Sequence, residues 1–383
     1  MNWQIPLFDP DLGEAELEAV AQVVRSKWLT MGVRTAQFES EFASLVGCQH
    51  AVALNSCTAA LHVALLALDV GPGDEVICPA LTFVATANAI RYCGARPVFA
   101  DVDSLECWNV SRASLEAVAT PNTKAVMVVH YGGYPCAMPE ILAFAKARGL
   151  SVVEDAAHAP GATVDGRPLG GWGDVGCFSF FSNKNMTTGE GGMLTTNRYD
   201  VADRASRLRS HGMTTLTLDR HKGHAFSYDV VDLGYNYRMS ELNAALGMAQ
   251  LPMLSARNRR RAELVRRYRT NLRSAPGLSI PFGRPVGNPA YHLFVALLGE
   301  GIERSEVMTA MKTAGIQTSI HYRPVDTFTS YRRAGLGPSD RLTLTHAIGD
   351  RVLTLPLYPS MTDSQVDRVC EILIQSIAAA TVA

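Results

Sequence analysis

Short strand-like runs alternate with helix-like runs through residues 50–158, and this alternation restricts the possible folds more than any other feature of the chain. The strand-like runs are "HAVALN" (50–55), "EVICPA" (75–80), "RPVFADVD" (96–103), "KAVMVVHY" (124–131) and "LSVVEDAAH" (150–158). Between them, apolar residues recur at helical spacing, at 58–70, 83–94, 114–120 and 139–149. Strands joined by helices pair in parallel, and helices then cover both faces of the sheet. The alternation therefore predicts an α/β fold with a mostly parallel sheet, whose ligands bind where the strands end.

The pattern changes after about residue 240. A long helical run at 240–275 contains Pro252, which predicts an interruption or a kink, because proline removes a helical hydrogen bond. Beyond it follow a strand-like run at 291–298 and helical runs at 304–315 and 363–380. A chain of 383 residues is long for a single core. We therefore predict a large domain of residues 1–250 and a smaller C-terminal α+β domain of residues 251–383.

The chain carries no excess of charge that would attract nucleic acid or an acidic membrane. Its formal net charge is −1, with 47% hydrophobic and 19% charged residues, as is typical of a well-buried globular enzyme. The basic run "RNRRRAELVRRYR" (257–269) has helical spacing, which favours a solvated or interdomain face over a nucleic-acid site. We predict neither nucleic acid nor membrane among the partners.

The N-terminus and the cysteines bear on the compartment. No basic segment followed by an apolar run opens the chain, so no signal peptide is predicted. The longest apolar stretches, such as 59–68, are much shorter than a membrane span. Eight cysteines are scattered without a C-x-x-C pair, which is typical of reduced thiols rather than of disulfides or a zinc site. We predict a cytoplasmic protein without a metal ion.

One lysine, Lys184, lies in a loop of small, hydroxyl-bearing and aromatic residues, "CFSFFSNKNMTTGEGGM" (177–193). An amine attacks a carbonyl carbon only when its charged form is disfavoured, and apolar neighbours disfavour that form by excluding water. These surroundings suit a lysine that forms a Schiff base with a planar cofactor. An exposed loop lysine is the alternative.

Asp155 stands at the end of the last strand-like run, three residues before His158. A carboxylate buried at a strand end needs a cation, and no lysine or arginine is near in sequence. The protonated pyridine nitrogen of pyridoxal phosphate is such a cation, because the cofactor withdraws electrons only in that form. A helix N-cap is the alternative for Asp155.

Ser56 and Thr58 stand between a strand-like run and a helical run. The N–H groups at the start of a helix bind anions, so a phosphate group fits there. An ordinary helix cap would give the same pattern. The first strand is not followed by G-x-G-x-x-G, and no G-x-x-x-x-G-K-[ST] occurs, which argues against dinucleotide and P-loop sites.

Seven segments, in order along the chain, resemble the DegT/DnrJ/StrS family of sugar aminotransferases, which are fold-type-I pyridoxal-phosphate enzymes. The segments are "WLTMG", "NSCTAALH", "PALTFVATANAI", "VEDAAHAPGA", "GDVGCFSFFSNKNMTTGEGGM", "GYNYRMSELNAALG" and "LPLYPSM". The resemblance extends from about residue 5 to the C-terminus, and the stretch from Asp155 to Lys184 is its most specific part.

The resemblance implies roles for single residues. Lys184 would carry pyridoxal 5'-phosphate as a Schiff base and would shuttle a proton between cofactor carbons. Asp155 would pair with the pyridine nitrogen. His158 would contact the cofactor near its ring hydroxyl, with a hydrogen-bonded core histidine as the alternative. Phe83 would stack on the pyridine ring, although core packing would also explain a phenylalanine there.

The phosphate group would be held by residues from two segments and by a second subunit. The family pattern assigns Ser56, Cys57, Thr58 and Ser179 to the phosphate. It also assigns Asn236 of "GYNYR" to the phosphate of the neighbouring subunit. The resemblance therefore implies a homodimer with shared active sites.

The expected reaction is a transamination in two halves, from an amino acid, expected to be L-glutamate, to a nucleotide-linked 4-keto-6-deoxyhexose. Cyclitol and 3-keto-sugar aminotransferases remain alternatives. A sugar dehydratase of this family would carry histidine in place of Lys184, and a non-catalytic homologue would be expected to lose Lys184 or Asp155. Two residues depart from the family pattern: Cys57 replaces the usual glycine, and Asp326 stands where many members have a histidine near the sugar.

Overall fold

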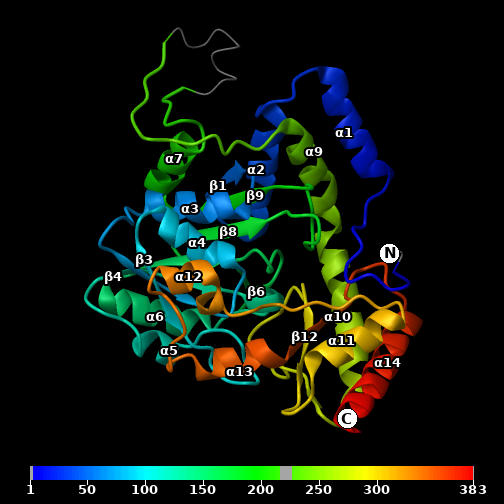
Figure 1. Cartoon of the computed structure of the whole chain (residues 1–383). Coiled ribbons are helices and arrows are strands. Elements are labelled where there is room, and N and C mark those ends of the chain that lie inside the picture. Colours follow the sequence, from blue (N-terminus) through cyan, green and yellow to red (C-terminus); the bar gives the residue numbers. More distant parts are fainter. Residues whose placement is uncertain (1–2, 216–226, 383) are drawn as a thin grey trace.

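A seven-stranded sheet lies at the centre of the larger part of the molecule, with the strand order β1-β9-β8-β5-β4-β2-β3 (Figure 1). The computed structural model describes residues 3–215 and 227–382. The strands are β1 (His50–Leu54), β2 (Glu75–Pro79), β3 (Arg96–Ala100), β4 (Thr123–Val129), β5 (Ser151–Asp155), β8 (Val175–Ser179) and β9 (Gly192–Thr196). β9 runs antiparallel to both β1 and β8, and the other neighbouring strands run parallel. The predicted mostly parallel sheet is confirmed.

Helices cover both faces of this sheet. One layer contains α2 (Val33–Val46), α5 (Arg112–Glu116) and α6 (Met138–Arg148), and the other contains α3 (Cys57–Ala67), α4 (Val84–Tyr92) and α7 (Tyr199–Leu208). In β4, Val126 and Val128 pack with the first layer, whereas Ala125 and Met127 pack with the second. Because both faces are buried, the strands are apolar throughout. Shorter elements are η1 (Tyr131–Gly133) and the hairpin of β6 (Thr163–Val164) and β7 (Arg167–Pro168).

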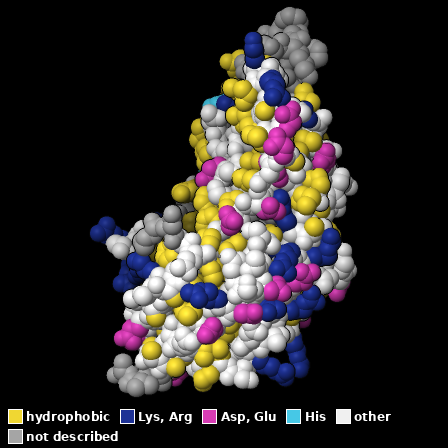
Figure 2. All heavy atoms as spheres, turned by 90° about the vertical axis from the view of Figure 1, so that its right-hand side faces the viewer, with side chains coloured by type: hydrophobic (Ala, Val, Ile, Leu, Met, Phe, Trp, Pro, Cys, Tyr) yellow, Lys and Arg dark blue, Asp and Glu magenta, His cyan; other side chains and the backbone are white. Residues whose placement is uncertain are grey.

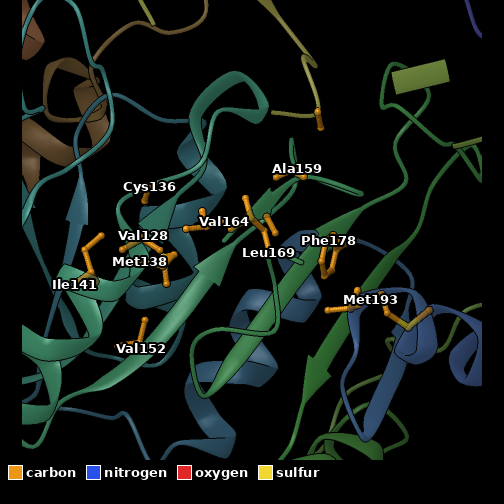
Figure 3. Packing of buried hydrophobic residues seen from close by; sticks show 14 of the residues in the cluster. Val128, Cys136, Met138, Ile141, Val152, Ala159, Val164, Leu169, Phe178 and Met193 are labelled. Carbon is orange, nitrogen blue, oxygen red and sulfur yellow. The ribbon is translucent and has the colours of Figure 1, made fainter. Parts of the chain in front are cut away.

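An apolar core beside α6 holds the strands β5, β8 and β9 in place. Figure 3 shows Phe178 of β8 near Met193 of β9, and Val152 of β5 near Met138 and Ile141 of the α6 segment, all within one apolar cluster. Phe178 also meets Phe42 edge to face at 4.9 Å between ring centroids. Such pairs restrain ring orientation beyond simple burial. The core thereby sets the positions of the β5 and β8 ends.

The chain leaves the large sheet through a broken helix. α9 (Glu241–Gln250) packs against α1 (Glu14–Ser26), and α10 (Leu254–Asn271) continues into the C-terminal part. Between them, η2 (Leu251–Met253) is a 3₁₀ turn that contains Pro252. The interruption predicted at this proline is confirmed.

A three-stranded antiparallel sheet of order β10-β11-β12 forms the smaller part. Its strands are β10 (Leu278–Ser279), β11 (Phe294–Leu298) and β12 (Val352–Leu355). The other elements are α11 (Arg304–Thr313), η3 (Val325–Thr327), α12 (Thr329–Arg333), α13 (Thr343–Arg351) and α14 (Asp363–Val382). A separate apolar cluster joins α10, α11 and α14 to this sheet, and Ile5 from the N-terminus packs in it. In Figure 1 these helices lie together at the lower right, beside the N-terminal segment.

Three arginines of the basic run, Arg257, Arg260 and Arg267, pair with acidic residues of the same chain. Arg260 contacts Asp363 at 2.9 Å, and Arg267 contacts Asp367 at 2.5 Å. Figure 2, which views this side of the molecule, shows basic and acidic side chains interspersed. Arg260 and Arg267 thus lie on the face that α10 shares with α14. In the described part of the chain, no helix combines the length and apolar character needed to cross a membrane.

Candidate active site

A cavity of about 280 Å³ opens where the parallel strands of the large sheet end. Side chains from six segments line it: the start of α3, the start of α4, the ends of β4, β5 and β8 with their loops, and residues 321–322 of the smaller part. The sequence-predicted residues in this lining are Ser56, Cys57, Thr58, Phe83, Asp155, His158, Ser179 and Lys184. Eight of the nine candidate residues thus meet at one cavity, and Asn236 does not.

Asp155 is the last residue of β5, and its buried carboxylate reaches the cavity. One oxygen accepts a hydrogen bond from the Ala157 N–H at 3.2 Å, and the other accepts one from Thr86 Oγ1 at 2.8 Å. Burial raises the pKa of Asp155, although these hydrogen bonds and the charge of Lys184 oppose the rise. Residues 156–162 contain turns and no helix, so the helix N-cap alternative is wrong.

Lys184 is half-buried in the turn that follows β8. Its backbone N–H donates to the Phe181 carbonyl at 2.9 Å, which fixes the turn. Burial lowers the pKa of Lys184 to about 8, even though Cys57 and Asp155 favour its charged form. The exposed-lysine alternative is therefore wrong for this residue. An amine with a lowered pKa is present in part as the free base at neutral pH, which is the form that attacks a carbonyl group.

The first turn of α3 points into the cavity as the sequence predicts. Ser56 is the N-cap, and its hydroxyl accepts a hydrogen bond from the Ala59 N–H at 3.1 Å. Cys57 and Thr58 are the first two residues of the helix, where backbone N–H groups have no partner within the helix. Such a helix start, with its partial positive charge, is suited to an anion.

β9 begins directly against this turn, and Gly192 makes the approach possible. A Cβ at Gly192 would lie 2.4 Å from the carbonyl carbon of Ser56 and 2.5 Å from the nitrogen of Cys57. Those atoms belong to the backbone and cannot move aside cheaply. Burial raises the pKa of the Cys57 thiol well above its ordinary value, so this side chain is neutral at the turn. Cys57, which replaces the glycine usual in the family, thus places an uncharged side chain in the wall of the cavity.

Phe83 and Ser179 are the other two predicted site residues that the larger part of the molecule brings to the cavity. Phe83 immediately precedes α4, and 56% of it is exposed. The core-packing alternative is wrong for Phe83, because its ring lines the cavity. Ser179 ends β8, and its hydroxyl accepts a weak hydrogen bond from the Phe181 N–H at 3.4 Å.

His158 is buried, and both of its ring nitrogens have partners. Nδ1 accepts a hydrogen bond from the Gly132 N–H at 3.2 Å, and Nε2 lies 3.0 Å from the hydroxyl of Tyr322. Burial keeps the pKa of His158 well below its ordinary value. His158 is therefore hydrogen-bonded within the chain, as the alternative of a core histidine predicts. It also lines the cavity, so a contact with a ligand stays open to it.

The sequence argument missed His321 and Tyr322, which bring the smaller part of the molecule to the cavity. His321 Nδ1 lies 2.9 Å from Thr354 Oγ1, and burial together with the charge of Lys184 lowers the pKa of His321 to about 4. The ring of Tyr322 lies 6.0 Å from that of Phe83. The motif "IHYRPVD" (320–326) contains both residues, but no local pattern shows that it folds back onto α4.

Two other residues lie away from the cavity of their own chain. Asn236 is exposed, and its backbone forms an isolated bridge with Ser210. Asp326 is fully buried and accepts a hydrogen bond from His346 Nε2 of α13 at 2.7 Å. Asp326 is thus engaged by its own chain and is absent from the described lining of the cavity.

Known proteins resemble the chain over nearly its whole length. The model of the DegT/DnrJ/EryC1/StrS aminotransferase family matches residues 10–374. The spore coat polysaccharide biosynthesis protein SpsC of Bacillus subtilis (strain 168) is 45% identical, over 97% of this chain and 96% of that protein.

Two solved structures superpose closely. The putative sugar aminotransferase Spr1654 of Streptococcus pneumoniae, in its PMP form, gives a TM-score of 0.92 at 30% identity, and the match covers 98% of this chain and 100% of that one. DesI, solved in the presence of its TDP-sugar product, gives a TM-score of 0.86 at 32% identity, over 100% of this chain and 94% of that one. Spr1654 has also been solved in a PLP form. The chain therefore belongs to the DegT/DnrJ/EryC1/StrS aminotransferase family, and it is a fold-type-I, pyridoxal-phosphate-dependent transaminase.

Proposed function

We propose that this enzyme moves an amino group from L-glutamate to a nucleotide-linked 4-keto-6-deoxyhexose. The observation that carries the proposal is the convergence of Lys184, with its pKa of about 8, and the buried Asp155 on one cavity. Two similarities support a sugar substrate: SpsC is named for polysaccharide biosynthesis, and DesI was solved with a TDP-sugar product. We also propose a cytoplasmic location, because the cysteines are free, as is typical of a reducing compartment.

The residues of the cavity fit pyridoxal phosphate. The start of α3 offers unpaired N–H groups and the Thr58 hydroxyl to a phosphate group, and Ser179 adds a second hydroxyl from β8. The close approach of Gly192 holds this helix start in place. No arginine or lysine other than Lys184 stands in the described lining, so hydrogen bonds and the helix dipole would carry the phosphate on this side.

The part of the cavity beside Asp155 suits a protonated pyridine ring. Asp155 would hold the proton on the ring nitrogen, since a buried carboxylate without a paired cation gains most from such a partner. Thr86 and the Ala157 N–H orient the carboxylate. Phe83 presents its exposed ring to the cavity, where it would lie against the ring of the cofactor. When bound, the cofactor supplies the electron withdrawal that stabilises a carbanion.

Lys184 would serve the reaction at its Nζ atom. Its lowered pKa lets Nζ release a proton near neutral pH and take one back, so the same atom can carry a proton between two positions in the cavity. Phe181 and Cys57 are uncharged cavity neighbours that help to exclude water from Nζ. A dehydratase of this family is not favoured, because it would need histidine at position 184.

We further propose that the active enzyme is a homodimer in which Asn236 reaches the phosphate group of the partner subunit. Two features support this proposal: Asn236 is exposed, and it lies outside its own cavity. The chain also exposes large apolar side chains, such as Leu17 and Val24 of α1, that an interface would cover.

Turnover of a substrate panel with glutamate tests the proposed reaction. The panel contains nucleotide-linked 4-keto-6-deoxyhexoses, 3-keto sugars and keto cyclitols, and mass spectrometry detects the amino product. We expect the 4-keto sugar to have the largest kcat/KM. Lys184→Ala should abolish turnover, whereas Lys146→Ala, a change at an exposed lysine of α6, should not. Preferred amination of a cyclitol or a 3-keto sugar would refute the proposed substrate while leaving the transaminase in place.

A further inference from the structure

The segment that carries Asn236 is held against α3 by aromatic side chains that serve none of the roles described above. We propose that His62 of α3 is a positioning residue: with Tyr235 and Tyr237, it holds Asn236 in the place from which Asn236 reaches the phosphate group of the partner subunit. This role rests on the proposed shared site. It predicts that a change at His62 impairs the site of the partner and spares the site of its own chain.

The backbone around Asn236 is extended and lies beside β1, the edge strand of the large sheet. On one side Asn236 forms a bridge with Ser210, and on the other the Asn55 N–H, just beyond β1, donates to the carbonyl oxygen of Tyr237 at 2.8 Å. Successive side chains of an extended segment point to opposite sides. The rings of Tyr235 and Tyr237 both contact α3, whereas Asn236 is exposed. Whatever fixes the two tyrosines therefore also fixes the direction of Asn236.

His62 contacts both tyrosines at once. The rings of Tyr235 and Tyr237 are stacked, with 4.9 Å between their centroids and 9° between their planes. The ring of His62 meets Tyr235 edge to face at 4.9 Å and Tyr237 at 6.1 Å. Its Nδ1 also lies 3.3 Å from the hydroxyl oxygen of Tyr237. Ring pairs of this kind have preferred orientations, so His62 restrains the pair and the backbone between them.

A histidine is an unexpected residue at this place in α3. The other buried residues of the helix are alanine, leucine, valine and cysteine, and His62 is itself buried. Burying an imidazole is unfavourable unless its nitrogens are hydrogen-bonded. Among the described residues, Nε2 of His62 has no hydrogen-bond partner, so the hydroxyl of Tyr237 is the polar contact of this ring. The contact with the tyrosines thus explains a histidine where an aliphatic side chain would pack without that penalty.

An effect on the phosphate site of its own chain is the alternative role for His62, because α3 begins at that site. Ser56 caps the start of α3, and Gly192 packs directly against it, so this start has supports of its own. His62 lies about one turn beyond Thr58, and its ring contacts Tyr92 and the segment of residues 235–237. The two roles can be separated, because they affect the cavities of different subunits.

The first test compares the affinities for pyridoxal phosphate and for pyridoxal, which lacks the phosphate group. Each affinity is measured as the amount of ligand that borohydride fixes to Lys184 at increasing ligand concentration. His62→Leu removes the contact with both tyrosines. We expect its affinity for pyridoxal phosphate to fall roughly tenfold, as for a weakened hydrogen bond to a charged group, and that for pyridoxal to change less than about twofold. The double variant with Asn236→Ala should match Asn236→Ala alone, since both changes act through one contact.

A mixed dimer shows in which subunit His62 acts. His62→Leu chains and Lys184→Ala chains carry different tags, and the mixed dimer is purified through both tags. Only the cavity of the His62→Leu chain then contains Lys184, and it receives Asn236 from a chain whose His62 is intact. We expect the affinity of this cavity for pyridoxal phosphate to return to the wild-type value. A loss that persists in the mixed dimer would overturn the proposal, because His62 would then act within its own chain.

His50→Leu is the matched control. It removes another histidine that meets a tyrosine edge to face, Tyr199 at 5.9 Å, at the opposite end of β1 from the Asn236 segment. Both affinities should stay unchanged in this variant. An unchanged affinity in His62→Leu, or equal losses for pyridoxal phosphate and pyridoxal, would also refute the role of His62.

If His62→Leu does not fold, Tyr237→Phe takes its place in the mixed dimer, because it removes only the hydroxyl that contacts His62. We expect a loss of about threefold in the Tyr237→Phe homodimer, and none at the Lys184 of the mixed dimer. No loss in the homodimer, or a loss retained in the mixed dimer, would contradict the proposal. Failure of the shared site would look different, because Asn236→Ala would then bind pyridoxal phosphate as tightly as the wild type.

Discussion

Single residues at this site were predictable where a short motif surrounds them. Lys184 and Asp155 stand out because each lies in an unusual local context, a lysine among aromatic residues and an acid at a strand end. The bonding of His158 was not predictable, because its partner Tyr322 is 164 positions away in the chain. The resemblance implies a contact of His158 with the cofactor, which stays a prediction, and the structure adds that both ring nitrogens have partners within the chain.

A change at Asp155 tests its charge without altering its shape. Asp155→Asn keeps an oxygen to accept from Thr86 or from the Ala157 N–H, but it cannot hold a proton on the pyridine nitrogen. We expect the variant to bind the cofactor and to lose at least a hundredfold in kcat, since electron withdrawal depends on that proton. Cofactor absorbance measures binding, and stopped-flow kinetics of each half-reaction measure the loss. Near-wild-type turnover would show that Asp155 does not have this role.

The lowered pKa of Lys184 also has a consequence for stability. With a pKa of about 8 in the folded protein, against 10.5 ordinarily, this proton is bound less tightly in the folded state. The lowered pKa therefore reduces the free energy of unfolding by its full amount below about pH 8, and this penalty fades as the pH rises toward 10.5.

Replacing Lys184 with methionine removes this penalty. We expect Lys184→Met to raise the free energy of unfolding of the cofactor-free protein by roughly 2 kcal/mol at pH 7 and by less at pH 9. Chemical denaturation at both pH values measures the change, with the exposed Lys146→Met as control. A loss of stability, or a gain that is equal at both pH values, would show that burial of this amine is not the cause of its lowered pKa.

At the scale of elements, the alternating pattern identified the strands β1 to β5 and the helices between them, because both are local. The strands β8 and β9 carried no such signal. Their sequences, "VGCFS" and "GMLTT", are rich in glycine and hydroxyl side chains, and their pairing depends on contacts with strands far away in the chain. The antiparallel direction of β9 likewise depends on its pairing with β1, which no local propensity encodes.

The contact between β9 and α3 leads to a prediction for Gly192. A methyl group there would meet the Ser56–Cys57 backbone, so Gly192→Ala should displace the start of α3. We expect the affinity for pyridoxal phosphate to fall at least tenfold, and the affinity for pyridoxal, which lacks the phosphate group, to change less. Gly71→Ala, where a Cβ meets nothing within 4 Å, serves as the control. Equal losses for both ligands would indicate general damage instead of a displaced phosphate site.

At the scale of the whole molecule, the parallel sheet and its two helical layers follow from the hydrophobic pattern of the sequence. The residues that the smaller part adds to the site do not. The division at residue 250 remains a prediction, and Ile5 shows why the sequence alone could not settle it: the N-terminus packs in the cluster of the C-terminal helices. The smaller part also supplies His321 and Tyr322 to a cavity that otherwise belongs to the large sheet.

Mixing two inactive variants tests whether two chains share a site. Lys184→Ala and Asn236→Ala are each expected to be inactive as homodimers. In a heterodimer, one composite site carries both changes and the other carries neither, so part of the activity should return. Mass spectrometry of differently tagged chains confirms that subunits have exchanged. Verified exchange without recovery, from two variants that fold, would show that Asn236 does not serve the partner's site.

The central claim is that Lys184 is the residue that holds the cofactor for amino transfer, and reduction with borohydride tests it most directly. The purified holoenzyme is reduced, digested and mapped by mass spectrometry, and a parallel sample receives glutamate first. The account predicts that the cofactor is fixed to a single peptide, the one that contains Lys184, and that treatment with glutamate prevents the labelling by converting the cofactor to its amine form. Label on any other lysine, or a bound cofactor that borohydride does not attach, would contradict the account.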